Sequence, residues 1–255
     1  MTPISAVVIT LDEEARLGAA LESVRFCDEV LVVDAGSTDR TREIAAAAGA
    51  RVELHTPWPG FTAQRNHAVA AARHDWVLAV DADERVTPAL RAEIESLRAS
   101  GFAHAGYRMP RVAFYLGRWI RGTDWYPDPQ LRLFDRRRGT WVGGLVHESV
   151  QVGGSVGHLR GDLEHHTYED IADHLSTIDR YTTLWAQQAH AEGRRAGPLD
   201  GCIASSWAFI RNYVVRGGFL LGEAGLTVST FNAYYTYAKM AKLRELARGG
   251  AAPQE

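Results

Sequence analysis

Alternation between short strand-like runs and helix-like stretches constrains the fold of this chain more than any other feature of its sequence. Runs typical of buried strands occupy residues 5–10, 29–34, 51–54 and 76–80. Helical spacing of apolar residues, or a helix-like composition, follows these runs at 13–24, 37–48, 61–73 and 89–99. This order predicts βαβ units around a parallel sheet.

Local signals at two places predict where helices begin and end. Ser37, Thr38 and Asp39 form a cluster that supplies an N-cap for the second helix, and Gly49 supplies its C-cap. Thr87 followed by Pro88 is typical of an N-cap and the first helical position. We therefore expect both helices to start at these caps.

The pattern changes beyond residue 100. Strand-like pieces rich in Gly, Arg and aromatic residues, at 107–114 and 130–135, indicate further strands of a mixed sheet. From Tyr168 onward the chain has a helical pattern, and the glycines between 193 and 197 predict a break between two helical segments. We expect an α/β domain over residues 1–167 and a helical region over 168–255.

Composition excludes several classes of protein. The 255 residues are 46% hydrophobic, which suits a large folded domain, and the formal charge of -3 gives no basic excess for binding nucleic acid. Cys27 and Cys202 lack metal-site spacing, so we expect a reducing compartment and buried or inert thiols. The sequence shows neither a signal peptide nor an apolar run long enough to span a membrane, which predicts a cytoplasmic protein.

Acidic residues follow two of the predicted strands. Asp34 ends one strand, and Asp81, Ala82, Asp83 and Glu84 follow another. Because ligands bind at the carboxyl ends of strands in open α/β sheets, we expect these carboxylates to share a crevice. Two carboxylates around a small residue suit a divalent ion that bridges a diphosphate, whereas the alternative is a solvated acidic turn. The position directly after a buried strand favours the ion site.

A set of motifs spread in order along the chain has a counterpart in a known family. They are VVITLDEEARL at 7–17, VVDAGSTDRT at 32–41, GFTAQRN at 60–66, VLAVDADE at 77–84, QLRLF at 130–134, VHE at 146–148 and LEHHTY at 163–168. With these motifs the chain resembles the family 2 glycosyltransferases of the GT-A fold. More narrowly it is similar to the lipopolysaccharide core glucosyltransferases of the WaaE/KdtX type.

The resemblance implies a nucleotide-sugar-binding half at 1–100, an acceptor-side half at 101–167 and a C-terminal helical extension. It also implies a UDP-sugar donor and a divalent metal, Mn²⁺ or Mg²⁺. The residues expected around the donor are Thr10, Glu13 and Asp34 for the uridine and ribose, Asp81 for the ribose or sugar, Asp83 for the metal and diphosphate, and Gln64, Arg65 and Asn66 nearby. The family usually has Asn where this chain has Asp12, and for Arg65 a surface position on a helix is the alternative.

Two further residues receive roles beside the donor. An inverting transfer needs a base for the acceptor hydroxyl, and Glu148 is the candidate, with a structural salt bridge as its alternative. The resemblance at LEHHTY implies that His165 completes the metal shell, although His165 and His166 equally suit a packed, hydrogen-bonded pair. We interpret His158 and His174 as non-functional.

Aromatic residues gather between the acidic motif and the VHE motif. They are Trp119, Trp125, Tyr126 and Trp141. Sugars stack their apolar faces on aromatic rings, so these residues suit an acceptor site, but they suit core packing equally well.

The function implied is inverting transfer of a hexose, glucose by family expectation, from a UDP-sugar to a hydroxyl of a cell-envelope glycan. The leading acceptor is the lipopolysaccharide inner core, and another lipid-linked glycan is the runner-up. A sugar-phosphate nucleotidyltransferase is a less favoured alternative, because no Gly-rich loop follows the first strand. A non-catalytic nucleotide-sugar or glycan-binding module is a third alternative.

The weakly charged, aromatic-rich stretch at 217–240 suits a helix that lies on an anionic membrane. Such a helix would hold the protein peripherally on the cytoplasmic face of the inner membrane, beside a lipid-linked acceptor. The alternative is a C-terminal helix pair packed on the catalytic domain or on a second subunit, and association into a homo-oligomer stays open.

Overall fold

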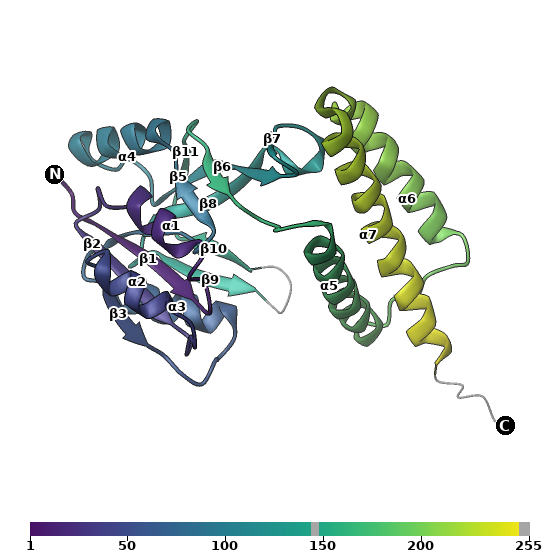
Figure 1. Ribbon diagram of the computed structural model, residues 1–255, viewed down its shortest axis with the longest axis horizontal. Helices are drawn as coiled ribbons and strands as arrows, with labels where there is room; N and C mark the ends of the chain where they lie inside the picture. Colours follow the sequence, from purple (N-terminus) through teal and green to yellow (C-terminus); the bar gives the residue numbers. More distant parts are fainter. Residues whose placement is uncertain (144–147, 250–255) are drawn as a thin grey trace. The chain divides into compact units, whose positions relative to one another are not determined.

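The computed structural model describes residues 1–143 and 148–249, and the chain divides into two compact units (Figure 1). The first unit contains Met1–Val112 and Asp128–His166, and the second contains Ala113–Pro127 and Thr167–Glu255. The second unit therefore takes in residues 113–127, a segment that the sequence pattern grouped with the α/β domain.

The first unit contains the α/β sheet and its helices. The strands that begin in it are β1 (Ile4–Thr10), β2 (Glu29–Asp34), β3 (Arg51–Leu54), β4 (Trp76–Ala79), β5 (Glu84–Val86), β6 (Gly106–Tyr115), β8 (Asp128–Asp135), β9 (Gly139–Gly143), β10 (Glu148–Val152), β11 (Val156–His158) and β12 (Leu163–His165). The helices are α1 (Leu17–Ser23), α2 (Thr41–Ala47), α3 (Phe61–Ala71) and α4 (Pro88–Ser100).

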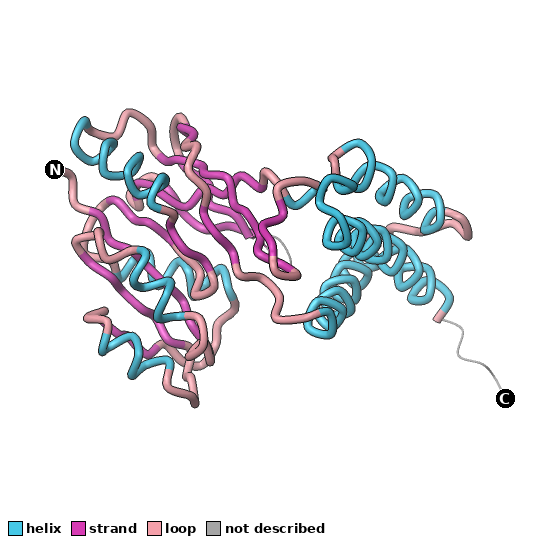
Figure 2. The backbone as a smooth tube through the Cα atoms, turned by 45° about the horizontal axis from the view of Figure 1, so that its top comes forward, coloured by secondary structure: helices cyan, strands magenta, loops and turns pink. Residues whose placement is uncertain are grey.

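The central sheet is parallel on one side and mainly antiparallel on the other, although β11 runs parallel to β6 there. Within the described residues its order is β3-β2-β1-β4-β8-β6-β12-β5. The first four strands are parallel, as the βαβ pattern predicts, and β8 then pairs antiparallel with both β4 and β6. A separate antiparallel pair is formed by β9 and β10. Figure 2 shows the strands of this unit with helices beside them.

Alternating residues of β1 explain why the sheet is covered on both faces. Val7 belongs to a core cluster with Ala68 and Val69 of α3. Val8 faces the opposite way and packs in a cluster with Leu17 and Leu21 of α1. Because successive side chains of a strand point to opposite faces, a strand with helices on both sides has apolar residues without interruption.

The helix start predicted at the cluster 37–39 is wrong, because α2 begins at Thr41 and its N-cap residue makes no side-chain bond, but Asp39 Oδ1 still accepts from the Thr41 backbone N at 2.9 Å. The side chains of the cluster also hold the loop after β1. Ser37 Oγ accepts a hydrogen bond from the Asp12 backbone N at 2.9 Å, and Asp39 Oδ2 accepts one from the Glu14 N at 3.0 Å. Glu13 and Glu14, predicted to be helical, belong to this loop, and α1 starts only at Leu17.

Asp12 is a departure from the family pattern that the local backbone accommodates. Its φ angle is 54°, a left-handed conformation in which Asn and Asp are enriched among residues other than glycine. Its Oδ1 accepts a hydrogen bond from the Thr38 backbone N at 2.8 Å. An Asn oxygen would accept the same bond, so this contact suits either residue. The other predicted cap is confirmed, since Thr87 Oγ1 accepts from the Leu90 N.

The two cysteines differ in exposure. Cys27 packs against the core of the first unit, and burial raises the pKa of its thiol to about 12, which makes it unreactive. Cys202 is exposed on α6.

The second unit is mainly helical. Besides the end of β6 it contains β7 (Arg118–Ile120), the 3₁₀ turns η1 (Thr123–Trp125) and η3 (Gly218–Leu221), the π-helical turn η2 (Arg211–Val215), and the helices α5 (Ile171–Ala191), α6 (Asp200–Ile210) and α7 (Gly222–Arg248). The break predicted at 193–197 is confirmed between α5 and α6. Helix α7 packs against both of its neighbours. None of the helices in the described residues has the length and apolarity to cross a membrane.

A buried aromatic cluster stabilises the second unit. His174 of α5 is 3% exposed and stacks on Tyr168 with ring centroids 4.1 Å apart. Its Nδ1 lies 3.0 Å from the hydroxyl of Tyr115, and Trp125 contacts it edge to face. Burial lowers the pKa of His174 to about 4. Trp125 therefore has the core-packing role that the sequence left open.

We predict that the His174→Phe variant loses less stability in acid than the parent chain. The folded pKa lies below the ordinary value near 6.5, so the unfolded state binds an extra proton between pH 6.5 and 4. Between pH 6.5 and pH 4, protonation of this residue should lower the unfolding free energy of the parent by about 2–3 kcal/mol. The variant lacks the imidazole and should not show this loss. Urea unfolding at pH 7 and pH 4.5 measures it. His158→Gln on β11 is the control for removing a histidine elsewhere, and equal acid losses in the parent and His174→Phe would contradict the prediction.

Candidate active site

The carboxyl ends of β1 and β2 meet through Thr10 and Asp34. These two residues are paired in the sheet register, and Thr10 Oγ1 donates to Asp34 Oδ2 at 3.1 Å. Asp34 is fully buried, and its Oδ1 accepts from the backbone N atoms of Gly36 and Ser37 at 3.0 and 2.9 Å. The Asp34 carboxylate thus organises the loop after β2, which in turn holds the loop after β1.

Glu13 lies in the loop after β1, in an acidic environment. Burial raises the pKa of its carboxyl to about 6, with further increases from the charges of Asp83, Asp39 and Asp81, while Arg16 opposes the shift. Carboxylates from the β1 loop and the β4 loop therefore influence one another. A cation between them would relieve this repulsion.

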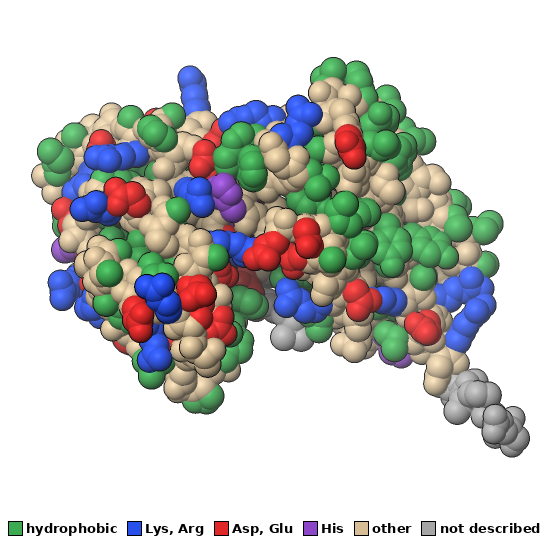
Figure 3. Space-filling model, in the orientation of Figure 1, with side chains coloured by type: hydrophobic (Ala, Val, Ile, Leu, Met, Phe, Trp, Pro, Cys, Tyr) green, Lys and Arg blue, Asp and Glu red, His purple; other side chains and the backbone are tan. Residues whose placement is uncertain are grey.

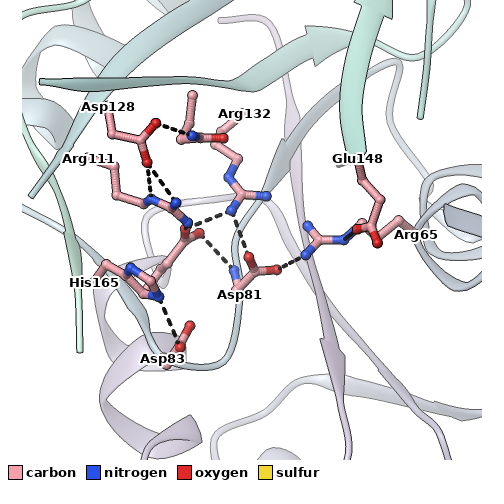
Figure 4. Close-up of polar contacts among 10 residues, drawn as sticks. Arg65, Asp81, Asp83, Arg111, Asp128, Arg132, Glu148 and His165 are labelled. Carbon is pink, nitrogen blue, oxygen red and sulfur yellow. Dashed lines mark hydrogen bonds and ion pairs between the residues drawn. The ribbon is translucent and has the colours of Figure 1, made fainter. Parts of the chain in front are cut away.

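Asp81, in the loop after β4, is held between two arginines (Figure 4). Its Oδ1 lies 2.9 Å from Arg65 of α3, and its Oδ2 lies 2.6 Å from Arg132 of β8. Although burial alone would raise the pKa of Asp81, the guanidinium groups of Arg132 and Arg65 hold it well below its usual range. The charge of Asp81 is consequently compensated by two arginines, whereas Asp83, two residues later, lies beside His165.

A buried glutamate that sequence reasoning missed supports this arrangement. Glu84 is fully buried and contacts Arg132 at 2.6 Å and Arg111 at 3.1 Å. Its other oxygen accepts from the Asp81 backbone N at 3.0 Å. Arg111 also pairs with Asp128 at 2.7 Å. The signal available in the sequence was Arg132 itself, a charged residue inside the apolar strand QLRLF, but nothing in the sequence pairs it with Glu84.

Gln64, Arg65 and Asn66 of α3 have different positions. Arg65 is the one whose charge reaches Asp81, and its guanidinium lies 4.4 Å from the ring centroid of Trp141. Asn66 binds the backbone N and O of Trp141 at 2.9 Å each, while buried Gln64 contacts His55 Nδ1 at 2.6 Å. Trp141 packs in the core, beneath Arg65 and Arg132.

Glu148, at the start of β10, faces the other side of Arg65. Its Oε2 lies 3.5 Å from Arg65 Nε, so Arg65 links Asp81 to Glu148 (Figure 4). Burial raises the pKa of the Glu148 carboxyl, and the Arg65 charge partly offsets that rise. Val146 and His147, the rest of the VHE motif, lie outside the described residues.

Asp83 and His165 form a second pair beside Asp81. His165 Nε2 lies 3.2 Å from Asp83 Oδ2, and the His166 backbone N donates to the Asp83 carbonyl at 2.9 Å. The described residues hold no cluster of three or more potential metal ligands. A carboxylate and an imidazole this close are ligand types that a divalent ion accepts, so Asp83 and His165 are the residues that could hold Mg²⁺ or Mn²⁺ here.

Residues 5–150 match the model of glycosyl transferase family 2. This chain belongs to that family. It is 30% identical to the lipopolysaccharide core biosynthesis glycosyltransferase LpsC of Rhizobium meliloti, over 94% of this chain and 92% of LpsC. It is also 30% identical to a glycosyltransferase of Rickettsia typhi, over 96% of this chain and 88% of that protein. The family resemblance found in the motifs is confirmed.

Solved structures confirm the predicted GT-A fold for this family 2 glycosyltransferase. Glucosyl-3-phosphoglycerate synthase of Mycobacterium tuberculosis, solved with Mn²⁺, UDP and glucosyl-3-phosphoglycerate, superposes with a TM-score of 0.51 at 19% identity, over 74% of this chain and 79% of that one. Residues 1–349 of S. aureus TarS superpose with a TM-score of 0.50 at 13% identity, over 99% and 93% of the two chains.

We predict that Glu84→Gln destabilises this glycosyltransferase by about 3 kcal/mol, because it leaves the buried charge of Arg132 without its full compensation. Glu95→Gln, which removes the exposed partner of Arg91 on α4, is the matched control and should cost less than about 0.5 kcal/mol. Urea unfolding at pH 7 measures both. Equal effects of the two substitutions would show that Glu84 has no special structural role.

Proposed function

We propose that this family 2 glycosyltransferase moves a hexose, glucose in the first instance, from a UDP-sugar to an acceptor hydroxyl with inversion. The acceptor proposed is a lipid-linked cell-envelope glycan, the lipopolysaccharide inner core first. The observation that carries the proposal is that two carboxylates with different neighbours lie on either side of Asp81. Asp83 lies next to His165 on one side, and Glu148 lies next to Arg65 on the other. The similarity to LpsC supports the acceptor class.

On the donor side, Asp83 and His165 are the residues that would hold a divalent ion. The ion, when bound, neutralises charge on the departing diphosphate. The charges of Glu13 and Asp83 influence each other, and we assign Glu13 and Thr10 to the uridine and ribose. Asp34 supports this binding by holding the loop after β2 in place. The Mycobacterium tuberculosis synthase was solved with Mn²⁺ and UDP, which supports this donor chemistry.

On the acceptor side, Glu148 is the proposed base. It would accept the proton of the acceptor hydroxyl while that oxygen attacks the anomeric carbon and the bond to UDP breaks. A raised pKa strengthens a carboxylate as a base near neutral pH, because the proton affinity moves closer to the working pH. Arg65 contacts both Glu148 and Asp81, so it positions the base relative to the donor site.

A nucleotidyltransferase remains the less favoured function. The loop after β1 reads LDEEARL and is held by the side chains of Ser37 and Asp39, which leaves an acidic loop where a Gly-rich phosphate-binding loop would be needed. Release of UDP from UDP-glucose in the presence of an acceptor and a metal distinguishes transfer from nucleotidyl transfer and from silent binding.

We predict that Glu148→Gln keeps donor binding near the parent level while turnover falls at least about 100-fold, because the amide cannot accept the acceptor proton. Calorimetric titration of UDP and initial rates of UDP release measure the two properties. Glu22→Gln, at an exposed position paired with Arg25, is the control and should retain the parent rate. Near-parent turnover of Glu148→Gln would remove Glu148 from the role of base.

We also predict that UDP raises the melting temperature of the parent chain only when Mn²⁺ or Mg²⁺ is present. Asp83→Asn and His165→Ala should lose most of this metal-dependent increase, because each removes one proposed ligand. His158→Ala is the control for histidine removal and should respond as the parent does. Stabilisation by UDP that is equally large in EDTA would argue against a metal at this site.

A further inference from the structure

Asn66 of α3 holds the edge of β9 by three hydrogen bonds. Its Nδ2 donates to the Trp141 carbonyl at 2.9 Å, and its Oδ1 accepts from the Trp141 backbone N at 2.9 Å and from the Thr140 hydroxyl at 3.1 Å. Among the described residues β9 pairs with β10 alone, so no strand lies along its other edge there. The Asn66 amide therefore binds Trp141 as a residue of a neighbouring strand would, and we call the three bonds the Asn66 clamp.

The Asn66 clamp lies on the side of β9 that faces away from β10. Trp141 is opposite Val150 in the register of the pair. In an antiparallel ladder the backbone N and O of one residue point to the same side, and those of Trp141 point to Asn66. Both paired side chains also pack in a core cluster with Ala68 and Val69 of α3. Apolar packing has no direction, whereas hydrogen bonds set distance and angle, so the Asn66 clamp fixes where along α3 the strand pair lies.

The ring of Trp141 lies beneath the two arginines that hold Asp81. The Arg65 guanidinium lies 4.4 Å from the ring centroid, and the Arg132 guanidinium lies 5.6 Å from it. The indole Nε1 is buried and has no hydrogen-bond partner in the part of the chain that the structure describes. The ring therefore supports the arginines through its π-system. A shift of Trp141 would displace the support beneath Arg65.

Glu148 is placed by the same strand pair. It opposes Gly143 in the register, two residues along β9 from Trp141. At the rise of a β-strand this separation is about 7 Å. Arg65 precedes Asn66 in α3, and its Nε lies 3.5 Å from Glu148 Oε2. The helix thus places Arg65 and the strand pair places Glu148, and the Asn66 clamp joins these two elements.

We propose that Asn66 is a positioning residue, which fixes Glu148 against Arg65 through its hydrogen bonds to β9. The inference rests on the proposed function, because Glu148 is the proposed base. It differs from the expectation that Asn66 contacts the donor, since its Oδ1 already accepts two hydrogen bonds from β9 and its Nδ2 donates one. An error of about 1 Å in the position of a catalytic group can cost about 100-fold in rate. Loss of the Asn66 clamp should therefore lower turnover and leave donor binding unchanged.

Hydrogen exchange followed by mass spectrometry tests the Asn66 clamp without any sugar transfer. In Asn66→Ala the peptide 139–143 should exchange at least about tenfold faster than in the parent, because the Trp141 N–H loses its acceptor. Asn66→Asp keeps the acceptor oxygen and loses only the donation to the Trp141 carbonyl, so its rate should be intermediate. Circular dichroism melting verifies folding, and Asn66→Asp carries the test if Asn66→Ala does not fold.

Titration of UDP with Mn²⁺ and initial rates of UDP release from UDP-glucose separate positioning from donor binding. In Asn66→Ala, kcat should fall at least about tenfold, while the Kd of UDP and the KM of UDP-glucose stay within about twofold of the parent. In a Glu148→Gln background the same substitution should lower the remaining rate by less than about twofold, because no base is left to misplace.

The matched control removes an amide side chain that makes an exposed hydrogen bond elsewhere. Gln188→Ala on α5 removes the bond from Gln188 Nε2 to Glu192, and this variant should keep the turnover and the exchange of peptide 139–143 seen in the parent.

Two results would overturn the positioning role. One is unchanged exchange of peptide 139–143 in Asn66→Ala. The other is a loss of UDP affinity as large as the loss of turnover, which would make Asn66 a donor-binding residue. Failure of the proposed function has a different signature: the parent then releases no UDP, or Glu148→Gln releases it at the parent rate, while faster exchange in Asn66→Ala still supports the Asn66 clamp.

Discussion

The buried salt bridges that join Glu84, Arg132 and Asp81 are the interaction on which the site depends. Glu84 is fully buried and Arg132 nearly so, and charges in such positions are tolerated only when each is paired. The pairing brings the β4 loop against β8, and Arg111 extends it to β6. Asp81 thereby gains a fixed orientation, and Asp83, two residues later, is held next to His165 of β12.

Charge compensation divides the acidic residues of the site into two groups. Asp81 is neutralised by Arg65 and Arg132, whereas Glu13 feels the charges of neighbouring carboxylates and has a raised pKa. The arginine pairs fix the position of Asp81, whereas the carboxylates around Glu13 leave a negative potential that would attract a cation. Arg65 connects the two sides of the site because it contacts Asp81 and Glu148 at once.

The second unit shows a different use of apolar side chains. In α5 the aromatic cluster around His174 is buried and holds the unit together, while in α6 the large apolar residues are exposed and the small ones are buried. Packing against α7 therefore needs only the glycine and alanine side of α6. The opposite side of α6 exposes large apolar side chains, among them Ile203 and Trp207. Hydrophobic side chains gather along α6 at the upper right of Figure 3.

The sequence by itself determined the order of the first four strands and their helices, the Thr87 cap and the acidic residues at strand ends, because all of these are encoded by spacing within a few residues. Tertiary structure decided the rest. Glu84 at the start of β5 meets Arg111 of β6 and Arg132 of β8 through the tertiary arrangement of the sheet, and no local pattern encodes that pairing. Likewise α2 begins late because the residues before it bind a loop some 25 positions away in the chain. The sequence predicted helices on both sides of the 193–197 break, but only packing against α7 decided which side of α6 is buried.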